Sequence, residues 1–74
     1  MKLYEAIRKA EKYDVWFRPK SWSKKRVAYE VRNGIIYEVP SLQGGFRTLT
    51  TSADLLCGEW EVVHPDDVLN IEET

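Results

Sequence analysis

The stretch Val27-Ala-Tyr-Glu-Val-Arg-Asn-Gly-Ile-Ile-Tyr-Glu-Val39 predicts a β-hairpin. Two runs rich in β-branched and aromatic residues flank Asn33-Gly34, which is the preferred pair for a two-residue type I′ turn. Such a turn fixes the register of the two strands, so that Arg32 lies opposite Ile35 and the pairing continues outward from there. The hairpin is therefore the first element that the sequence places.

The predicted register gives the hairpin two different faces, because side chains alternate along a strand. One face is mainly apolar, and we expect it to pack against a helix; it carries Val27, Tyr29, Val31 and Ile36. The other face is mixed, as a subunit contact or the wall of a binding site would be; it carries Ala28, Glu30, Arg32, Ile35, Tyr37 and Val39.

The residues before the hairpin predict a helix and a short strand. Leu3, Ile7 and Ala10 recur at helical spacing, which favours a helix over residues 2–13. Val15-Trp-Phe-Arg18 is typical of a strand, and Pro19 is expected to end it. The basic residues from Lys20 to Lys25 are interpreted as a loop.

The residues after the hairpin predict a loop at 40–45, a strand at 46–51 and an N-cap at Ser52. A helical turn over 53–57 follows and ends at Gly58, and the last strand is expected over 60–64. We expect the acidic tail, residues 65–74, to be loosely ordered, with docking points at Val68, Leu69 and Ile71. The prediction is one α+β domain over residues 1–64, an N-terminal helix packed on a small antiparallel sheet of four to five strands with a central hairpin.

Size and composition suggest self-association. A chain of 74 residues buries only about 60% of the surface that its unfolded form exposes, so its core alone is marginal. The single cysteine, Cys57, can form no disulfide within the chain, and no Cys/His cluster suggests a structural metal. We therefore expect a homo-oligomer, a dimer or tetramer. Cys57 follows two leucines and is predicted to be buried, which fits a cytoplasmic protein with no membrane segment.

The charge is unevenly distributed along the chain. Residues 1–32 contain ten Lys/Arg and four Asp/Glu, whereas residues 33–74 contain one Arg and eight Asp/Glu. A basic half suggests an anionic partner or attraction between subunits. The acidic half argues against a dedicated duplex-DNA binder, so a nucleic-acid partner is not favoured.

The sequence offers little for catalysis or for a cofactor. His64 is the only imidazole and lies beside a proline at a strand end, and no Gly-rich phosphate loop or nucleophile elbow is present. We therefore expect no enzyme activity and no cofactor or metal.

The segment 16–26 is better suited to binding, because it alternates aromatic rings with cations. It contains Trp16, Phe17, Arg18, Lys20, Trp22, Lys24, Lys25 and Arg26. A tryptophan face stacks a nucleobase, and Arg or Lys binds phosphate. Trp16 and Phe17 alternate in a strand, so one of them is expected in the core. Trp22 is the ring that core packing explains least easily. Trp60, among Leu55, Leu56 and Val62, is more typical of a core residue.

The chain resembles the small phage proteins of the Thoeris anti-defence sponge family. The resemblance is carried by Leu3-Tyr-Glu-Ala-Ile7, by the segment from Arg18 to Trp22, and by Asp54-Leu-Leu followed by Glu59-Trp-Glu-Val-Val63. It implies a dimer or tetramer that sequesters cyclic ADP-ribose isomers or cyclic dinucleotides in pockets between subunits. It also implies that Trp22 stacks on the ligand, that Arg18 is a phosphate or framework contact, that Trp60 anchors the last strand and that Asp54 caps the preceding turn.

Two other functions remain open from the sequence. A small protein–protein inhibitor could dock on a host enzyme through the mixed hairpin face and Trp22. A single-stranded nucleic-acid binder could use the same basic aromatic segment, and its affinity would then fall steeply with salt.

Overall fold

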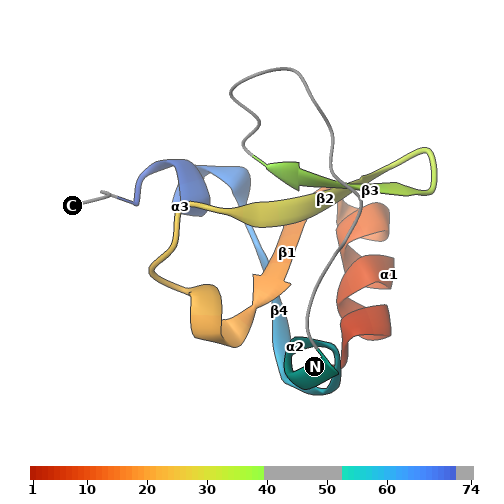
Figure 1. Cartoon of the computed structure of the whole chain (residues 1–74). Coiled ribbons are helices and arrows are strands. Elements are labelled where there is room, and N and C mark those ends of the chain that lie inside the picture. Colours follow the sequence, from red (N-terminus) through yellow and green to blue (C-terminus); the bar gives the residue numbers. More distant parts are fainter. Residues whose placement is uncertain (40–52, 72–74) are drawn as a thin grey trace.

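The computed structural model describes residues 1–39 and 53–71 of the chain. In chain order the elements are α1 (Leu3–Tyr13), β1 (Trp16–Pro19), the 3₁₀ helix η1 (Lys20–Trp22), β2 (Ala28–Arg32), β3 (Ile35–Val39), α2 (Ala53–Cys57), β4 (Trp60–Val63) and α3 (Pro65–Leu69) (Figure 1). The strands form one antiparallel sheet in the order β3-β2-β1-β4. The predicted α+β fold, with a helix packed on an antiparallel sheet that contains a hairpin, is confirmed. The predicted loop at 40–45, strand at 46–51 and N-cap at Ser52 lie outside the described residues.

The hairpin has the register that its turn dictates. Arg32 pairs with Ile35, and the pairing continues without a bulge to Ala28 and Val39. Asn33 and Gly34 have φ angles of 50° and 77°, and positive values at both positions are what a type I′ turn requires.

Strand β1 ends one residue later than predicted, because Pro19 pairs with Trp60 at the end of β4. A proline is tolerated there, since the backbone of Trp60 bonds to Met1 and needs no donor from Pro19. The chain then continues as η1, where a loop was expected, and the Ser23 N–H donates to the Lys20 carbonyl at 3.3 Å. The proline φ suits this entry into a tight turn.

The main core lies between α1 and the sheet. Ala6 and Ala10 are buried under α1 against three rings, those of Phe17, Tyr29 and Trp60. The ring centroids of Phe17 lie 5.7 Å from Tyr29 and 5.8 Å from Trp60, which is the range of favourable aromatic contacts. Small residues on the helix let it approach these large rings closely.

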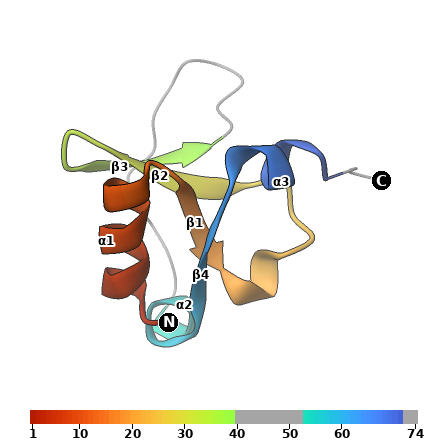
Figure 2. The same cartoon turned by 180° about the vertical axis from the view of Figure 1, so that it is seen from behind.

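The opposite face of the sheet is partly covered by α3, which the sequence had suggested was loosely ordered tail. Pro65 starts the helix, and Asp66 and Asp67 lie in its first turn, where carboxylates are favourable. Val68 is fully buried with three residues of the sheet, Ala28, Val39 and Val63. Figures 1 and 2 show α1 and α3 on opposite sides of the β1–β4 pair. The expected docking at Val68 is confirmed, and the expected loose order is wrong for residues 65–69.

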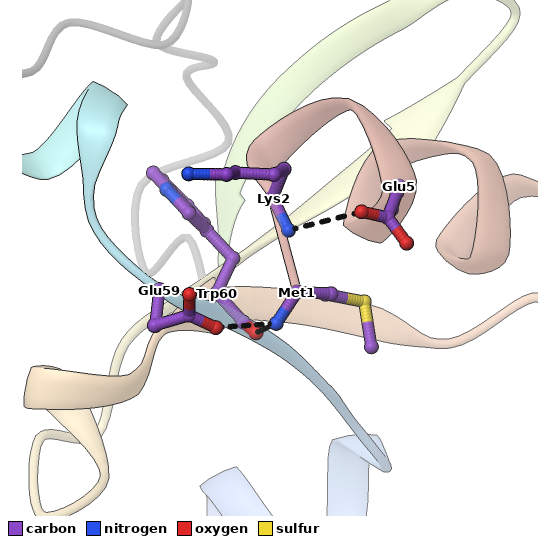
Figure 3. Close-up of polar contacts among 5 residues, drawn as sticks. All are labelled: Met1, Lys2, Glu5, Glu59 and Trp60. Atoms are coloured by element: carbon purple, nitrogen blue, oxygen red, sulfur yellow. Dashed lines mark hydrogen bonds and ion pairs between the residues drawn. The ribbon is translucent and has the colours of Figure 1, made fainter.

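The first residue adds to the edge of β4 (Figure 3). The Trp60 N–H donates to the Met1 carbonyl at 2.8 Å, and the Met1 ammonium donates to the Trp60 carbonyl at 3.1 Å. The same ammonium lies 2.7 Å from Oε2 of Glu59. The Lys2 N–H donates to Oε1 of Glu5 at 3.4 Å at the start of α1. The N-terminal residue therefore ties α1 to β4.

Cys57 is exposed, contrary to the expectation from its apolar neighbours. Consecutive positions on a helix point about 100° apart, so adjacent apolar residues in a helix as short as α2 cannot all face the core. Leu56 is also exposed, at 46%. Among the described residues, none of the helices is both long enough and apolar enough to cross a membrane.

We predict that Val68→Ala lowers the free energy of unfolding by about 1–3 kcal/mol, because it removes fully buried methyl groups. The matched control is Leu69→Ala, the next residue of α3, which is 39% exposed and should change stability by less than about 0.5 kcal/mol. Urea titration followed by circular dichroism measures both values. Equal effects of the two variants would mean that α3 does not dock as described.

We predict that stability falls in acid partly through Glu59. A hydrogen bond from the N-terminal ammonium, together with the charge of that ammonium, lowers the pKa of Glu59. A lowered pKa means stabilisation that is present above the ordinary carboxyl pKa and is lost as the pH falls through the lowered value. Thermal melts across the acid range should therefore show a flatter pH dependence for Glu59→Gln than for the wild type. Glu11→Gln, at an exposed position of α1, should keep the wild-type slope.

Candidate functional site

Trp22, the predicted stacking residue, is half-buried at the end of η1. Its ring centroid lies 5.8 Å from that of Tyr29, so it packs against the edge of the main core. Lys25 contributes a second contact, with Nζ 5.2 Å from the indole centroid. The structure thus places Trp22 neither inside the core nor free of it. The ring of Tyr29 supports the indole, and the Lys25 ammonium lies over it.

The position of Lys25 follows from the local backbone. The Lys25 N–H donates to the Trp22 carbonyl at 2.9 Å, and this turn brings residue 25 back toward residue 22. Lys25 belongs to the basic aromatic segment, but the sequence alone predicts no particular role for it. The signal that could have identified it is the three-residue spacing from Trp22 in a segment that forms successive tight turns.

The cations closest to Trp22 in the chain are exposed, and we call residues 20–26 the basic lobe. Its cationic side chains are those of Lys20, Lys24, Lys25 and Arg26. After the N-terminal ammonium, Lys20 also contributes to the lowered pKa of Glu59, which precedes β4. Exposed cations beside a supported indole are the elements from which proteins build sites for nucleotides.

Arg18 lies elsewhere, on the sheet face opposite the main core. It alternates with Phe17 along β1, and its Nε lies 2.9 Å from Oε2 of Glu61 on β4. Arg18 is only 8% exposed. Trp22, in contrast, packs on the side of the sheet that α1 covers. The structure therefore does not bring Arg18 and Trp22 together, and the geometry of Arg18 is that of a framework contact between two strands.

The Arg18 guanidinium is incompletely paired. Its Nη1 is buried and has no hydrogen-bond partner among the residues that the structure describes. Burial of an unpaired donor is unfavourable. The ion pair with Glu61 therefore offsets most of the free-energy cost of burying the charge of Arg18.

Trp16 and Tyr37, which we consider as structural or interface residues, are linked across the mixed hairpin face. The indole N–H of Trp16 donates to Oε2 of Glu30 at 3.2 Å, and Nε of Arg32 lies 2.8 Å from Oε1 of the same residue. The Arg32 guanidinium in turn lies 5.9 Å from the ring centroid of Tyr37. This chain of contacts orders the polar side chains of a face that is otherwise only partly covered.

Trp60 and Asp54 occupy the elements that were expected for them. Trp60 is fully buried at the start of β4 and belongs to the main core, which confirms it as a core residue. Asp54 lies in α2, and its role as a cap stays a prediction.

The described residues hold little acid–base or metal chemistry. His64 is exposed at the N-cap of α3, and no group of three or more metal-ligating side chains occurs in residues 1–39 and 53–71. Burial raises the pKa of Tyr29, and the nearby Glu38 raises it further, so the phenol beneath Trp22 stays neutral. Cations beside an indole have the chemistry to meet a phosphate and a planar ring.

Comparisons with protein-family models, with curated proteins and with solved structures find no match to this chain.

We predict that Glu61→Gln lowers the free energy of unfolding by roughly 1–3 kcal/mol, because it removes the charged partner of a buried guanidinium. The matched control is Arg32→Gln, which breaks the pair with Glu30 at its solvent-exposed end, where the side chain of Arg32 is 70% exposed and that of Glu30 is 18% exposed. An exposed pair contributes only about 0–1 kcal/mol. Denaturant unfolding of the two variants gives the comparison, and a larger loss for Arg32→Gln would contradict the framework role of Arg18.

Proposed function

We propose that this chain is a non-enzymatic, phage-type anti-defence protein that sequesters a cyclic nucleotide immune signal. The ligand class is a cyclic ADP-ribose isomer or a cyclic dinucleotide, bound at a contact between subunits in the cytoplasm of the host cell. Binding without turnover would keep the signal from its effector.

The observation that carries the proposal is the setting of Trp22. Its indole is half-buried, is supported by Tyr29 and lies under the flexible side chain of Lys25. Stacking of a nucleobase on such a ring contributes about 1–3 kcal/mol per base. Displacing Lys25 from the ring costs less than this, because an exposed cation–π contact is worth about 0.5–1 kcal/mol. The displaced ammonium would then be available to the ligand phosphates.

The charges of the basic lobe favour a small, compact anion. Four exposed cations lie within residues 20–26, whereas the second half of the chain is acidic. A cyclic nucleotide needs only the lobe and its ring. Arg18 takes no direct part in this proposal, because Glu61 already holds it.

The proposal predicts selective thermal stabilisation by one member of a nucleotide panel. Melts are recorded with cyclic ADP-ribose isomers, cyclic dinucleotides, linear ADP-ribose, ATP and single-stranded oligonucleotides. At a ligand concentration of 100 times Kd, the stabilisation is about 2.7 kcal/mol, which raises the Tm of a domain of this size by roughly 4–8 °C. A shift only with oligonucleotides, growing with their length and lost in salt, would support nucleic-acid binding instead. No shift with any compound would contradict the proposal.

The role of Trp22 is separated from folding by two variants. Trp22→Leu keeps an apolar contact with Tyr29 but has no plane on which a base can stack, so it should melt near the wild type and lose the ligand shift. Tyr4→Ala removes an aromatic residue that is 63% exposed on α1, and it should keep the shift. An unchanged ligand shift in Trp22→Leu would exclude stacking on this indole.

A further inference from the structure

Strand β3 forms one edge of the four-stranded sheet in the part of the chain that the structure describes. A two-residue turn makes its flanking residues a mutually hydrogen-bonded pair, and such pairs alternate along the ladder. The pairs bonded toward β2 are then Arg32–Ile35, Glu30–Tyr37 and Ala28–Val39. It follows that the backbone N–H and C=O groups of Ile36 and Glu38 point out of the sheet.

The other edge, along β4, is largely occupied. The Lys20 N–H donates to the Glu59 carbonyl at 3.0 Å, so alternation turns the peptide groups of Trp60 and Val62 away from β1. Met1 bonds to both backbone groups of Trp60. Along this edge, Val62 is the described residue whose outward N–H and C=O have no backbone partner among the described residues. The two edges of the sheet therefore differ in their capacity to pair.

We propose that β3 pairs in antiparallel fashion with β3 of a second copy of this chain, with Tyr37 at the two-fold axis. In this register Ile36 of each copy lies opposite Glu38 of the other, and every outward N–H and C=O of these residues is used. A register centred on Glu38 would place two carboxylates opposite each other, which is unfavourable. A register centred on Ile36 would place Glu38 opposite Gly34, in the turn.

The side chains along β3 suit a second copy in this register. Ile35, which is 45% exposed, comes to lie beside Val39 of the second copy, on the mixed hairpin face. Tyr37 faces its counterpart across the axis, and the carboxylates of Glu38 stay apart. Edge pairing of this kind is isologous, so it closes after one step. The occupied edge at β4 then limits further growth, and the product is a dimer with one continuous sheet.

This inference deepens the self-association in the proposed function, but it does not depend on nucleotide binding. All of its tests are made without ligand. A failed nucleotide panel would therefore leave the dimer standing, and a monomeric chain would leave nucleotide binding to be judged by the melts.

The register is tested by cysteine cross-linking in a Cys57→Ser background. Opposed residues at a position without mutual hydrogen bonds have Cα atoms about 4.5 Å apart, which lies within the range of a disulfide. Tyr37→Cys should therefore give a covalent dimer on mild oxidation, seen on a non-reducing gel. Ile35→Cys is the matched control. In this dimer the Cα atoms of the two cysteines at position 35 would lie roughly 14 Å apart, at about 3.4 Å per residue. This variant should therefore stay monomeric on the gel, although position 35 is exposed.

The association itself is tested on the unmodified chain by sedimentation over a concentration series. Wild-type protein should sediment as a dimer, and Glu38→Pro should shift it toward monomer, because proline removes an outward N–H without touching the ladder to β2. A melt of Glu38→Pro close to that of dilute wild type would show that the fold is kept. A wild-type monomer at every concentration, or cross-linking of Ile35→Cys as readily as Tyr37→Cys, would overturn the proposal. If the chain proves to be a monomer, the strand predicted at 46–51 becomes the candidate to pair with the edge of β3.

Discussion

The contact among the rings of Phe17, Tyr29 and Trp60 is the interaction on which the rest of this fold depends. These residues come from three different strands, and the helix α1 adds Ala6 and Ala10 to the same cluster. A domain of 74 residues has little core to spare, and aromatic side chains each bury about 150–250 Å². Removing any of these rings would therefore weaken the packing of α1 on the sheet.

Local sequence signals predicted the parts of the fold that are set by local physics. The turn at Asn33-Gly34 gave every pair of the hairpin correctly, because the turn type leaves no freedom in register. The apolar spacing of α1 and the glycine after α2 were also sufficient. The sequence did not predict α3, because a five-residue helix exists here through the docking of Val68 on the sheet, which is a tertiary contact.

The candidate site was only partly predictable for a related reason. Composition correctly indicated a basic aromatic segment, and the cations of the basic lobe are exposed. Neighbours in sequence need not be neighbours in space, however. Strand alternation turns Arg18 toward Glu61, while the turn after η1 carries Trp22 back to the main core. The cation over the indole is Lys25, and only the backbone geometry of successive turns places it there.

Strands β1 and β2 are joined by a single backbone pair, Phe17 with Tyr29, whereas β1 and β4 share four pairs. The sheet is consequently made of two ribbons, β1–β4 and β2–β3, and the angle between these ribbons is set by side-chain packing more than by backbone hydrogen bonds. Trp22 is attached to one ribbon through η1 and touches the other through Tyr29. Any rocking of the hairpin relative to the β1–β4 ribbon would therefore change the surroundings of this indole.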